Sequence, residues 1–542
     1  MPSAYSGPSV APTKCLRPHD TPPAIYPSGQ ETELQTNVTP NEQPSATASS
    51  ATLHMPFDNT YARDLEGLYA RSKPAGSPAP RLLRLNSDLA NELGLDAEEM
   101  SSAAGLAVFA GNVVPAQAQP LAQAYAGHQF GGFSPQLGDG RALLLGEIVD
   151  RHGRRRDISL KGSGRTPFSR RGDGKAALGP VLREYLMGEA MHVLGIPTTR
   201  ALAAVATGAT VQREQLLPGA ILTRVAASHL RVGTFEYIAA RDDEVLLRRL
   251  ADYAIARHYA PLTSTPDPYL GLLQEVVERQ ASLVARWMGV GFIHGVMNTD
   301  NMTISGETID YGPCAFLEHF DPRAVFSSID TSGRYAYGNQ PAIAQWNLAR
   351  LADALLPLID ADAESAAQRA GAAVEAFAER FDFHWTSVLR LKLGLDGGGE
   401  DDRALADDYL TLLSQHRIDF TLAFARLADA AQGNDTPLRA LFGSAAAALE
   451  LWLQRWRERT RAVGTSPHEL KEALRCTNPI YIPRNHLVEA ALAAAVERDD
   501  LAPFERLLLV LEHPFDEHAA YSALAEPAPA EQTENYRTFC GT

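Results

Sequence analysis

The chain has 542 residues, of which 45% are hydrophobic and 21% are charged, so it has ample material for a large globular core. Its formal net charge of −16 excludes a protein that coats nucleic acid, because phosphate backbones bind to positive surfaces. The sequence has no apolar run of the roughly 18 residues needed to cross a bilayer, and no basic segment followed by an apolar block at its N-terminus. We expect a cytoplasmic protein with no membrane and no nucleic-acid partner.

The four cysteines lie far apart and form no CxxC pair: Cys15, Cys314, Cys476 and Cys540. This spacing excludes a disulfide-stapled secreted fold and a structural zinc site. Cys540 lies near the C-terminus, where a thiol is accessible to oxidants. It is either an inert surface cysteine or a redox-active one.

Residues 1–52 are rich in Pro, Ser, Thr, Ala and Gln and contain few large apolar residues, which predicts a disordered tail. Next, residues 142–149 and 157–161 are predicted to be neighbouring strands joined by a basic turn. An apolar stripe from Leu178 to Leu194 predicts a helix that ends at Gly195. Two more strands are expected at 201–206 and 219–225. One helix among several strands indicates a small α+β lobe.

Beyond residue 234 the pattern becomes helical. A stripe from Leu272 to Met288 predicts a helix that ends at Gly289, followed by a loop and a strand pair within 292–312. Further helices are predicted at 342–358, 364–382, 403–430, 436–462 and 485–497. We therefore expect three parts, namely the tail 1–52, an N-terminal extension with a small nucleotide-binding lobe at 53–233, and a helical lobe with a C-terminal helical extension at 234–542.

The segment from Phe292 to Met302, followed by Asp310-Tyr311-Gly312, is the strongest chemical signal in the sequence. Mg²⁺ prefers oxygen ligands, so Asn301 and Asp310 could hold it against a nucleoside triphosphate, with Asp300 as a general base. Short β-type segments at 302–304 and 308–309 would separate the two ligands. Kinase-like enzymes use the same combination of base, amide and Asp-Phe-Gly.

This segment departs from the protein-kinase pattern in two ways. It has no His-Arg-Asp, and Asp300 directly precedes Asn301 instead of lying several residues upstream. The competing interpretation is a hairpin in which Asp and Asn only form the turns.

A glycine-rich segment, Gln136–Arg141, is followed about twenty residues later by Lys161. Glycines let backbone N–H groups approach phosphate, and a lysine neutralises its charge. Gly172-Asp173-Gly174 repeats the Gly-Asp-Gly motif of this segment. It lies within a stretch from Arg151 to Arg183 where basic residues far outnumber acidic ones. The stretch is either an anion-binding loop or a solvated basic face.

A kinase-like lysine needs a glutamate partner on the adjacent helix, and Glu184 and Glu189 are both candidates. Helical periodicity does not choose between them. Arg224 and Arg231 could clamp phosphates or could form salt bridges between the lobes.

Together these segments resemble those of the selenoprotein O family of protein adenylyltransferases. Besides the segments above, the matching motifs include Ala126–Gly131, Leu160–Gly164, Gly195–Leu202, Asn478-Pro479 and Arg484-Asn485. The resemblance runs from about residue 55 to the C-terminus. It implies a protein-kinase-like bilobal α+β fold, with a small mixed α/β N-lobe and a large, mostly helical C-lobe. ATP would lie reversed relative to kinases, so that AMP is transferred and pyrophosphate leaves.

The resemblance also implies roles for single residues. Asp300 would accept the proton, Asn301 and Asp310 would bind Mg²⁺ or Mn²⁺, and family spacing favours Glu184 as the partner of Lys161. Nucleotide contacts would come from Gly138, Gly140, Arg141, Lys161, Asp173, Gly174, Arg224, Arg231 and Asp310. The acceptors would be Ser, Thr or Tyr hydroxyls of other proteins, and Cys540 resembles a redox-linked position of the family.

Three alternatives stay open: UMP transfer from UTP, a kinase that moves the γ-phosphate of ATP, and a non-catalytic pseudokinase that only binds nucleotide. The intact set Lys161, Asp300, Asn301 and Asp310 disfavours the pseudokinase. We expect a monomer.

Overall fold

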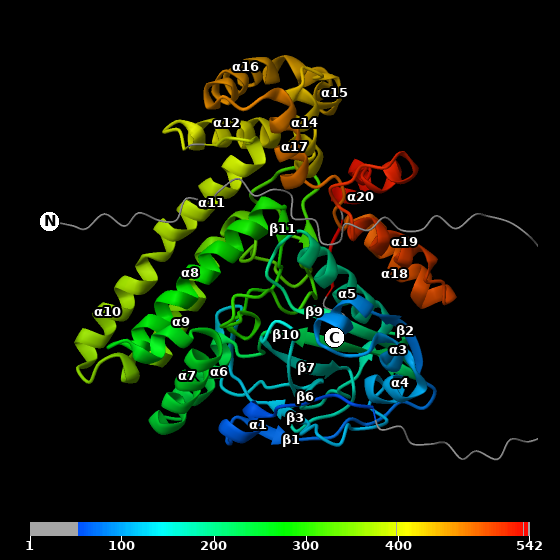
Figure 1. The fold of residues 1–542 in the computed structure, drawn as a ribbon, viewed down its shortest axis with the longest axis vertical. Helices are drawn as coiled ribbons and strands as arrows, with labels where there is room; N and C mark the ends of the chain where they lie inside the picture. Colours follow the sequence, from blue (N-terminus) through cyan, green and yellow to red (C-terminus); the bar gives the residue numbers. More distant parts are fainter. Residues whose placement is uncertain (1–52, 397, 535, 540–542) are drawn as a thin grey trace, which may run out of the picture. The chain divides into compact units, whose positions relative to one another are not determined.

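The computed structural model describes residues 53–396, 398–534 and 536–539 (Figure 1). Residues Thr52–Thr542 belong to one compact unit. The tail predicted at 1–52 and the two terminal cysteines, Cys15 and Cys540, lie outside the described residues.

The main sheet follows the order β1-β3-β6-β7-β10-β9-β2, and all its pairings are antiparallel. A short strand, β8 (Ala176–Ala177), also pairs with β10. The others are β1 (Tyr69–Arg71), β2 (Arg81–Leu85), β3 (Leu121–Gln123), β6 (Ala142–Val149), β7 (Arg155–Lys161), β9 (Arg200–Gln212) and β10 (Leu216–Ala226). The four strands predicted from the sequence are all present, and the last three are longer than predicted.

The two faces of this sheet bury different sets of side chains. On β7, Ile158 and Leu160 face an apolar cluster with the short helices α2 (Ser87–Glu92), α3 (Ala97–Ser101) and α4 (Ala103–Phe109). The alternate residues, Ser159 and Lys161, face the other side, because successive side chains of a strand point to opposite faces. The pairing Lys161↔Leu222 places the lysine beside the face that packs against helix α5 (Leu178–Val193).

Helix α5 is buried over nearly its whole circumference, since thirteen of its sixteen residues are buried. Its outer side packs against the C-terminal helices α18 (Asn485–Arg498) and α19 (Ala502–Leu511), as Figure 1 shows. A helix enclosed in this way has no solvated face, so its amphipathic pattern is weak.

Helices dominate the chain after the sheet. Besides α18 and α19, they are α6 (Val232–Ala239), α7 (Glu244–His258), α8 (Pro268–Gly289), α9 (Gln340–Ile359), α10 (Ala363–Glu375), α11 (Phe377–Leu393), α12 (Asp402–Gln415), α13 (Phe420–Ala425), α14 (Leu427–Ala431), α15 (Thr436–Phe442), α16 (Ala446–Val463), α17 (Pro467–Thr477) and α20 (Ala530–Glu534). Among the described helices, none is long and apolar enough to span a membrane. The result is a mixed α/β fold with one main antiparallel sheet, as expected for the α+β class.

Three predicted helices are interrupted in the structure. The prediction at 364–382 crosses the break between α10 and α11, and 403–430 is divided into three helices. There, Arg417 adopts a left-handed φ of 51° and the Asp419 carboxylate caps α13 by accepting from Leu422 N. The prediction at 436–462 breaks at Gly443, which also has a φ of 51°. Apolar periodicity continued across these turns because both flanking helices bury residues in the same core.

The strand prediction between the two metal-ligand candidates was wrong. Residues 302–304 and 308–309 form no strand pair; instead Thr303 bridges Arg231 and Thr308 bridges Thr198. The strand pair of this region is β11 (Phe292–Ile293) with β12 (Ala315–Phe316). Both threonines thus pair their backbone with a distant part of the chain, while the Thr303 hydroxyl also bonds locally to the backbone of Glu307.

Two neighbouring residues attach the C-terminal helices to this region. Asn485 accepts from Phe316 N and donates to Phe316 O, at 3.1 and 2.8 Å. Arg484 is fully buried and makes ion pairs with Glu318 and Asp419, both at 2.6 Å. One apolar core extends from Tyr61 to Ala525 and includes residues of the sheet and of the helices.

Candidate active site

Lys161 lies between two carboxylates at the end of strand β7. Its Nζ pairs with Glu184 Oε2 of α5 at 2.5 Å and with Asp310 Oδ1. The lysine is 13% exposed and Glu184 is 7% exposed, so solvent screens this cluster little. The structure therefore brings together residues that are 149 positions apart in the chain.

The other glutamate of α5 has a different partner. Glu189 binds the Arg200 guanidinium at 2.6 Å and also accepts from Ala201 N. Both glutamates are buried and both have a cation, as a buried carboxylate requires. Only Glu184 shares its cation with Asp310.

Two arginines add positive charge to the same cluster. Arg224 is buried on β10 and its Nη1 donates to Glu184 Oε1 at 3.2 Å. Burial alone would raise the pKa of Asp310, but the charges of Lys161, Arg141 and Arg224 hold that pKa well below its usual range. In the described part of the chain, the Arg141 guanidinium makes no hydrogen bond or ion pair, so it is available to a ligand.

Asp310 has a left-handed backbone with a φ of 67°, which is uncommon for a residue other than glycine. Its neighbours are fixed on both sides. His294 Nε2 hydrogen-bonds the carbonyl of Ile309 at 2.9 Å, and Arg183 donates from Nε to the carbonyl of Gly312 at 3.1 Å. Strain of this kind persists only where the surroundings hold it, and it concentrates at functional sites.

Asp300 and Asn301 lie in a short 3₁₀ helix, η2 (Thr299–Asn301). Asp300 is 9% exposed, and its Oδ1 is buried without a hydrogen-bond partner among the described residues. Burial raises the pKa of Asp300 to about 6, although the Arg231 charge opposes this shift. The Asn301 amide donates to Val296 O at 3.1 Å, which fixes its orientation.

Arg231 is buried next to this helix. Its Nη1 donates to the carbonyl of Asp300 at 3.2 Å and its Nε to the carbonyl of His229 at 3.1 Å. The guanidinium also lies over the Tyr125 ring, 4.2 Å from its centroid. Arg231 thus contacts the candidate base directly.

The glycine-rich segment 136–141 packs on the loop that follows β7. Gly138 has a φ of 79°, and a Cβ there would lie 2.4 Å from the Phe168 ring. A Cβ on Gly140 would lie 3.1 Å from the carbonyl of Phe168. Both positions therefore require the close approach that glycine allows.

Asp173 and Gly174 lie on that loop, away from the carboxylate cluster. Asp173 pairs with Arg213 at 3.0 Å and accepts from Lys175 N. A Cβ on Gly174 would lie 2.1 Å from the carbonyl of Gly164. Within the described residues, no hydrogen bond or ion pair joins Asp173 to Lys161, Asp300 or Asp310.

The basic stretch from Arg151 to Arg183 serves two purposes in the structure. Arg154 and Arg156 pair with Asp150, and Arg155 pairs with Asp58, so the first half stabilises the fold. Arg171 and Lys175 of the second half have no ion pair in the described chain, which leaves the loop after β7 positively charged.

The residues around Lys161 fit a triphosphate with its metal. Two buried donors, Arg224 Nε and Arg231 Nη2, lack a hydrogen-bond partner in the described chain, as does the acceptor Asp300 Oδ1. Orphaned donors suit phosphate oxygens, because an unpaired buried polar atom is costly. No cluster of three or more His, Cys, Asp or Glu that could hold a metal occurs among the described residues. Mg²⁺, however, needs only one or two protein oxygens beside phosphate and water.

Sequence reasoning assigned no role to the hairpin of β4 (Gly127–Gln129) and β5 (Gly132–Ser134). The Gln129 amide donates to Asp300 Oδ2 at 3.3 Å, and His128 N donates to Thr299 Oγ1 at 2.7 Å. The segment Ala126–Gly131 was part of the family resemblance, but a motif match does not reveal which residue a side chain contacts.

Cys314 lies four residues after Asp310 and is a free, fully buried thiol. Burial raises the pKa of Cys314 to about 11, which keeps the thiol protonated and unreactive.

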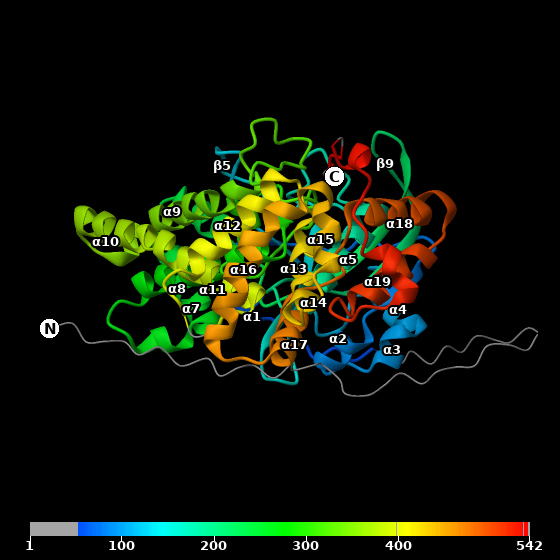
Figure 2. The same cartoon turned by 90° about the horizontal axis from the view of Figure 1, so that it is seen from above.

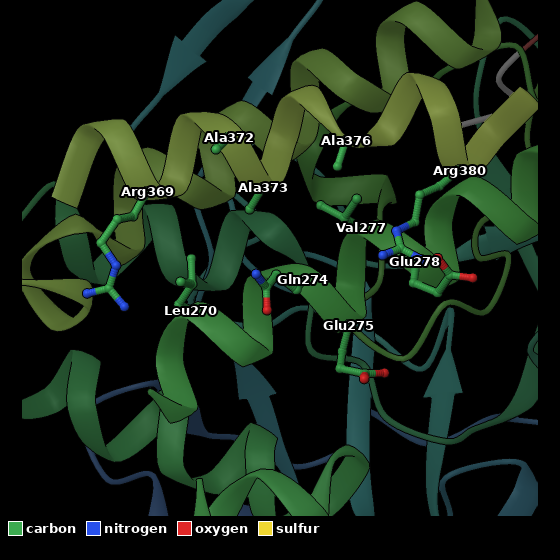
Figure 3. Close-up of a pocket in the computed structure, with 10 residues that line it drawn as sticks. All are labelled: Leu270, Gln274, Glu275, Val277, Glu278, Arg369, Ala372, Ala373, Ala376 and Arg380. Atoms are coloured by element: carbon green, nitrogen blue, oxygen red, sulfur yellow. Dashed lines mark ion pairs between the residues drawn. The ribbon is translucent and has the colours of Figure 1, made fainter. Parts of the chain in front are cut away.

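A groove of about 550 Å³ lies between α8 and the helices α10 and α11, and none of the predicted site residues lines it. Figure 3 shows Ala372, Ala373 and Ala376 along it, with Arg369 and Arg380 toward its two ends. Arg369 pairs with Asp267 and Arg380 with Glu278, each at 3.0 Å, so their charges are already compensated. The groove is separate from the cluster around Lys161.

Comparison with known proteins relates most of the described chain to one family. The family described as "Protein adenylyltransferase SelO" matches residues 51–512. The chain is 63% identical over 487 residues to a protein nucleotidyltransferase YdiU of Cereibacter sphaeroides, covering 90% of this chain and 99% of the relative. It is 59% identical over 475 residues to the protein of that name from Chromobacterium violaceum, covering 88% and 99%. It is 55% identical over 491 residues to the protein nucleotidyltransferase YdiU of Rhodopseudomonas palustris, covering 90% of this chain and 100% of the relative. The chain belongs to the protein adenylyltransferase SelO family.

Proposed function

We propose that the protein is a metal-dependent adenylyltransferase that moves AMP from ATP to Ser, Thr or Tyr hydroxyls of other proteins. The observation that carries the proposal is the cluster in which Lys161 joins Glu184 and Asp310. Family membership supports nucleotidyl transfer, since the matching family is described as protein adenylyltransferase and the relatives as protein nucleotidyltransferases.

In the proposed reaction, the acceptor oxygen attacks the α-phosphorus of ATP and forms a new P–O bond. The bond between that phosphorus and the oxygen bridging to the β-phosphorus breaks, so pyrophosphate leaves with the electron pair. Asp300 takes the acceptor proton. Its buried position next to Arg231 supports this role, and a pKa of about 6 suits a base that works near neutral pH.

The chain's own cations would hold the triphosphate. Lys161 and Arg141 are the partly exposed charges of the cluster, and Arg224 and Arg231 supply the buried donors that lack a hydrogen-bond partner. Gly138 and Gly140 would let the backbone approach the phosphates. Such preorganised charges contribute most where water is excluded.

Asn301 and Asp310 would hold Mg²⁺ or Mn²⁺, which would neutralise phosphate charge when bound. The fixed Asn301 amide and the low pKa of Asp310 support this assignment, because a ligand carboxylate must be ionised. Asp173 and Gly174 are proposed as nucleotide contacts from the loop after β7. Their pairing with Arg213 and Gly164 would then only shape that loop.

A kinase-like bilobal arrangement is part of the proposal, with the small lobe at 53–233 and the helical lobe at 234–542. The strands of the main sheet all lie within 69–226, and the long helices follow, which supports this division (Figure 1). The nucleotide is proposed to lie reversed relative to protein kinases, with its α-phosphate toward Asp300.

ATP labelled at either the α- or the γ-phosphate tests the proposal. The full-length protein with Mg²⁺ should transfer α-label to protein, and Asp300→Asn should reduce transfer by roughly 10²- to 10⁴-fold while it still binds ATP. Transfer of γ-label would instead identify a kinase. A parallel assay with α-labelled UTP separates UMP from AMP transfer.

A further inference from the structure

The β4–β5 hairpin, which contacts Asp300 through Gln129, carries two exposed aromatic side chains. Phe130 is 39% exposed and Phe133 is 44% exposed, although both follow closely on residues that contact the catalytic helix η2. Figure 2 shows β5 on the same edge of the molecule as the loop that precedes α9. Large exposed aromatic groups beside a reactive centre are typical of a binding surface.

The hairpin is locked to the catalytic segment by three successive residues. Its backbone donates from His128 N to Thr299 Oγ1 and from Phe130 N to Asn298 Oδ1, at 2.7 and 3.1 Å. Between them, the Gln129 amide donates to the Asp300 carboxylate. A molecule that binds to this hairpin is therefore held in a fixed position relative to Asp300.

The tip of the hairpin is strained. Phe130 has a φ of 51° and Gly131 a φ of 85°, the positive values that a type I′ turn requires at both central residues. Phenylalanine is a poor choice for this position, where Asn or Gly is usual. The Phe130 ring rests against Tyr335 at 5.1 Å, and its outer part stays exposed. A strained, exposed aromatic residue at a functional site suggests that the ring itself is used.

An uncompensated cation lies beside the same tip. The Arg334 guanidinium is 3.8 Å from the position that a Cβ on Gly131 would take, and it lies 4.9 Å from the ring centroid of Trp346. Among the described residues the Arg334 guanidinium forms no ion pair, since Asp330 accepts only from the Arg334 backbone N. Arg350, on the same Trp346 ring, pairs with Asp353.

We propose that Phe130, Phe133 and Arg334, here called the hairpin surface, bind the acceptor protein along the segment that carries the modified hydroxyl. The surface would select a large apolar side chain and an acidic side chain close to that hydroxyl. The aromatic rings match the first and the free guanidinium matches the second. This inference rests on the proposed AMP transfer, because it assigns that reaction's second substrate.

The first test uses Phe130→Asn and Phe133→Ser in the full-length protein. Asparagine tolerates the left-handed backbone, so the turn is retained. The matched control is Phe383→Ser on α11, where Phe383 is 67% exposed and distant in sequence from the site. The acceptors are peptides with one central Ser, Thr or Tyr and randomised flanks, and the readout is α-label transferred from ATP.

We expect kcat/KM for peptide to fall roughly tenfold or more in both hairpin variants, and the Kd for ATP to stay within about twofold of wild type. Phe383→Ser should match wild type. Equal kcat/KM in all three variants would contradict the proposed role of the hairpin surface. The proposed function would still hold in that case, provided that the wild type transfers α-label. Absence of α-label transfer by the wild type would contradict both the proposed function and the role of the hairpin surface.

A charge exchange provides a second, independent test. Wild-type enzyme should prefer Asp or Glu near the acceptor hydroxyl, and Arg334→Glu should reverse this preference toward Lys or Arg. A purely structural role of Arg334 cannot produce such a reversal. An unchanged peptide preference together with weaker ATP binding would assign Arg334 to the nucleotide and would contradict the inference.

Discussion

The Nη1 atom of Arg231 donates a hydrogen bond to the backbone carbonyl of Asp300 at 3.2 Å. The same guanidinium lies 3.9 Å from Asp139 of the glycine-rich segment and covers the ring of Tyr125. One cation therefore connects the segment proposed to hold phosphate with the residue proposed to accept the proton.

Arg231→Lys should lower kcat by roughly tenfold or more, because lysine keeps the charge but loses the planar fork that binds both carbonyls. Steady-state kinetics with α-labelled ATP measure the effect. Arg241→Lys is the matched control, since Arg241 also covers a tyrosine ring and binds a carbonyl, yet lies on the surface. Equal losses in the two variants would show that the geometry of Arg231 is unimportant.

Lys161→Met should abolish measurable transfer and weaken ATP binding, because Glu184 and Asp310 would face each other with less compensation. We expect a loss of at least about 10²-fold in kcat/KM. Lys73→Met, at an exposed position, controls for the loss of one positive charge. Calorimetric titration with ATP reports the binding step separately, and unchanged ATP affinity would contradict the role of Lys161.

Gly127→Ala should impair catalysis without unfolding the protein. A Cβ at this position would lie 2.6 Å from Asp300 Oδ1, so the carboxylate must move, and small misplacements of a reacting group are costly. Gly132→Ala in the paired strand is the control, because its Cβ would meet its nearest neighbour at 3.4 Å. The prediction is a lower kcat in the first variant only, with thermal midpoints compared for both.

Arg484→Ala should destabilise the fold by about 3–5 kcal/mol, because it leaves Glu318 and Asp419 buried without their shared cation. Arg498→Ala, at a side chain that is 61% exposed, should change the free energy of unfolding by less than about 0.5 kcal/mol. Urea titration at pH 7 measures both. A small effect at Arg484 would mean that water reaches this ion triad.

Lys392 predicts a pH dependence of stability. Burial lowers the pKa of Lys392 from 10.5 to about 7, with Asn478 Oδ1 accepting its hydrogen bond at 3.0 Å. Between these two pKa values the unfolded chain binds more protons than the folded chain, so this residue's contribution to stability increases as pH rises from 7 to 10.

Lys392→Met removes that contribution. The difference in unfolding free energy between wild type and variant should change in favour of the wild type by up to about 1.4 kcal/mol per pH unit above pH 7. Lys73→Met should show no such trend. Parallel curves for wild type and Lys392→Met would contradict a lowered pKa.

The sequence alone predicted the strands around Lys161 and the helix that follows, because their apolar patterns are clear. It could not choose between Glu184 and Glu189, since α5 is buried on nearly all sides and both positions look alike in periodicity. The choice depends on Arg200, which reaches Glu189 from the next strand. Such a contact follows from tertiary packing and not from local pattern.

In the region between Asn301 and Asp310, by contrast, the sequence led to a wrong prediction. Its β-type residues suggested a local strand pair, but Thr303 and Thr308 pair with distant residues. Contacts of the β4–β5 hairpin with Asp300 were equally hidden, because 171 residues separate Gln129 from its partner. Motifs identified the residues that carry charge, and the three-dimensional structure was needed to find those that position them.

The side chain of Asn485 fills the place that another strand would take beside Phe316, by both accepting from and donating to its backbone. A polypeptide that ended before Arg484 would leave an open edge six residues after Asp310 and would also lose the cation of the neighbouring ion triad. The part of the family match from Arg484 to residue 512 is therefore as integral to a working catalytic centre as the strands that precede it, and a shortened protein that keeps every predicted catalytic residue should still be inactive.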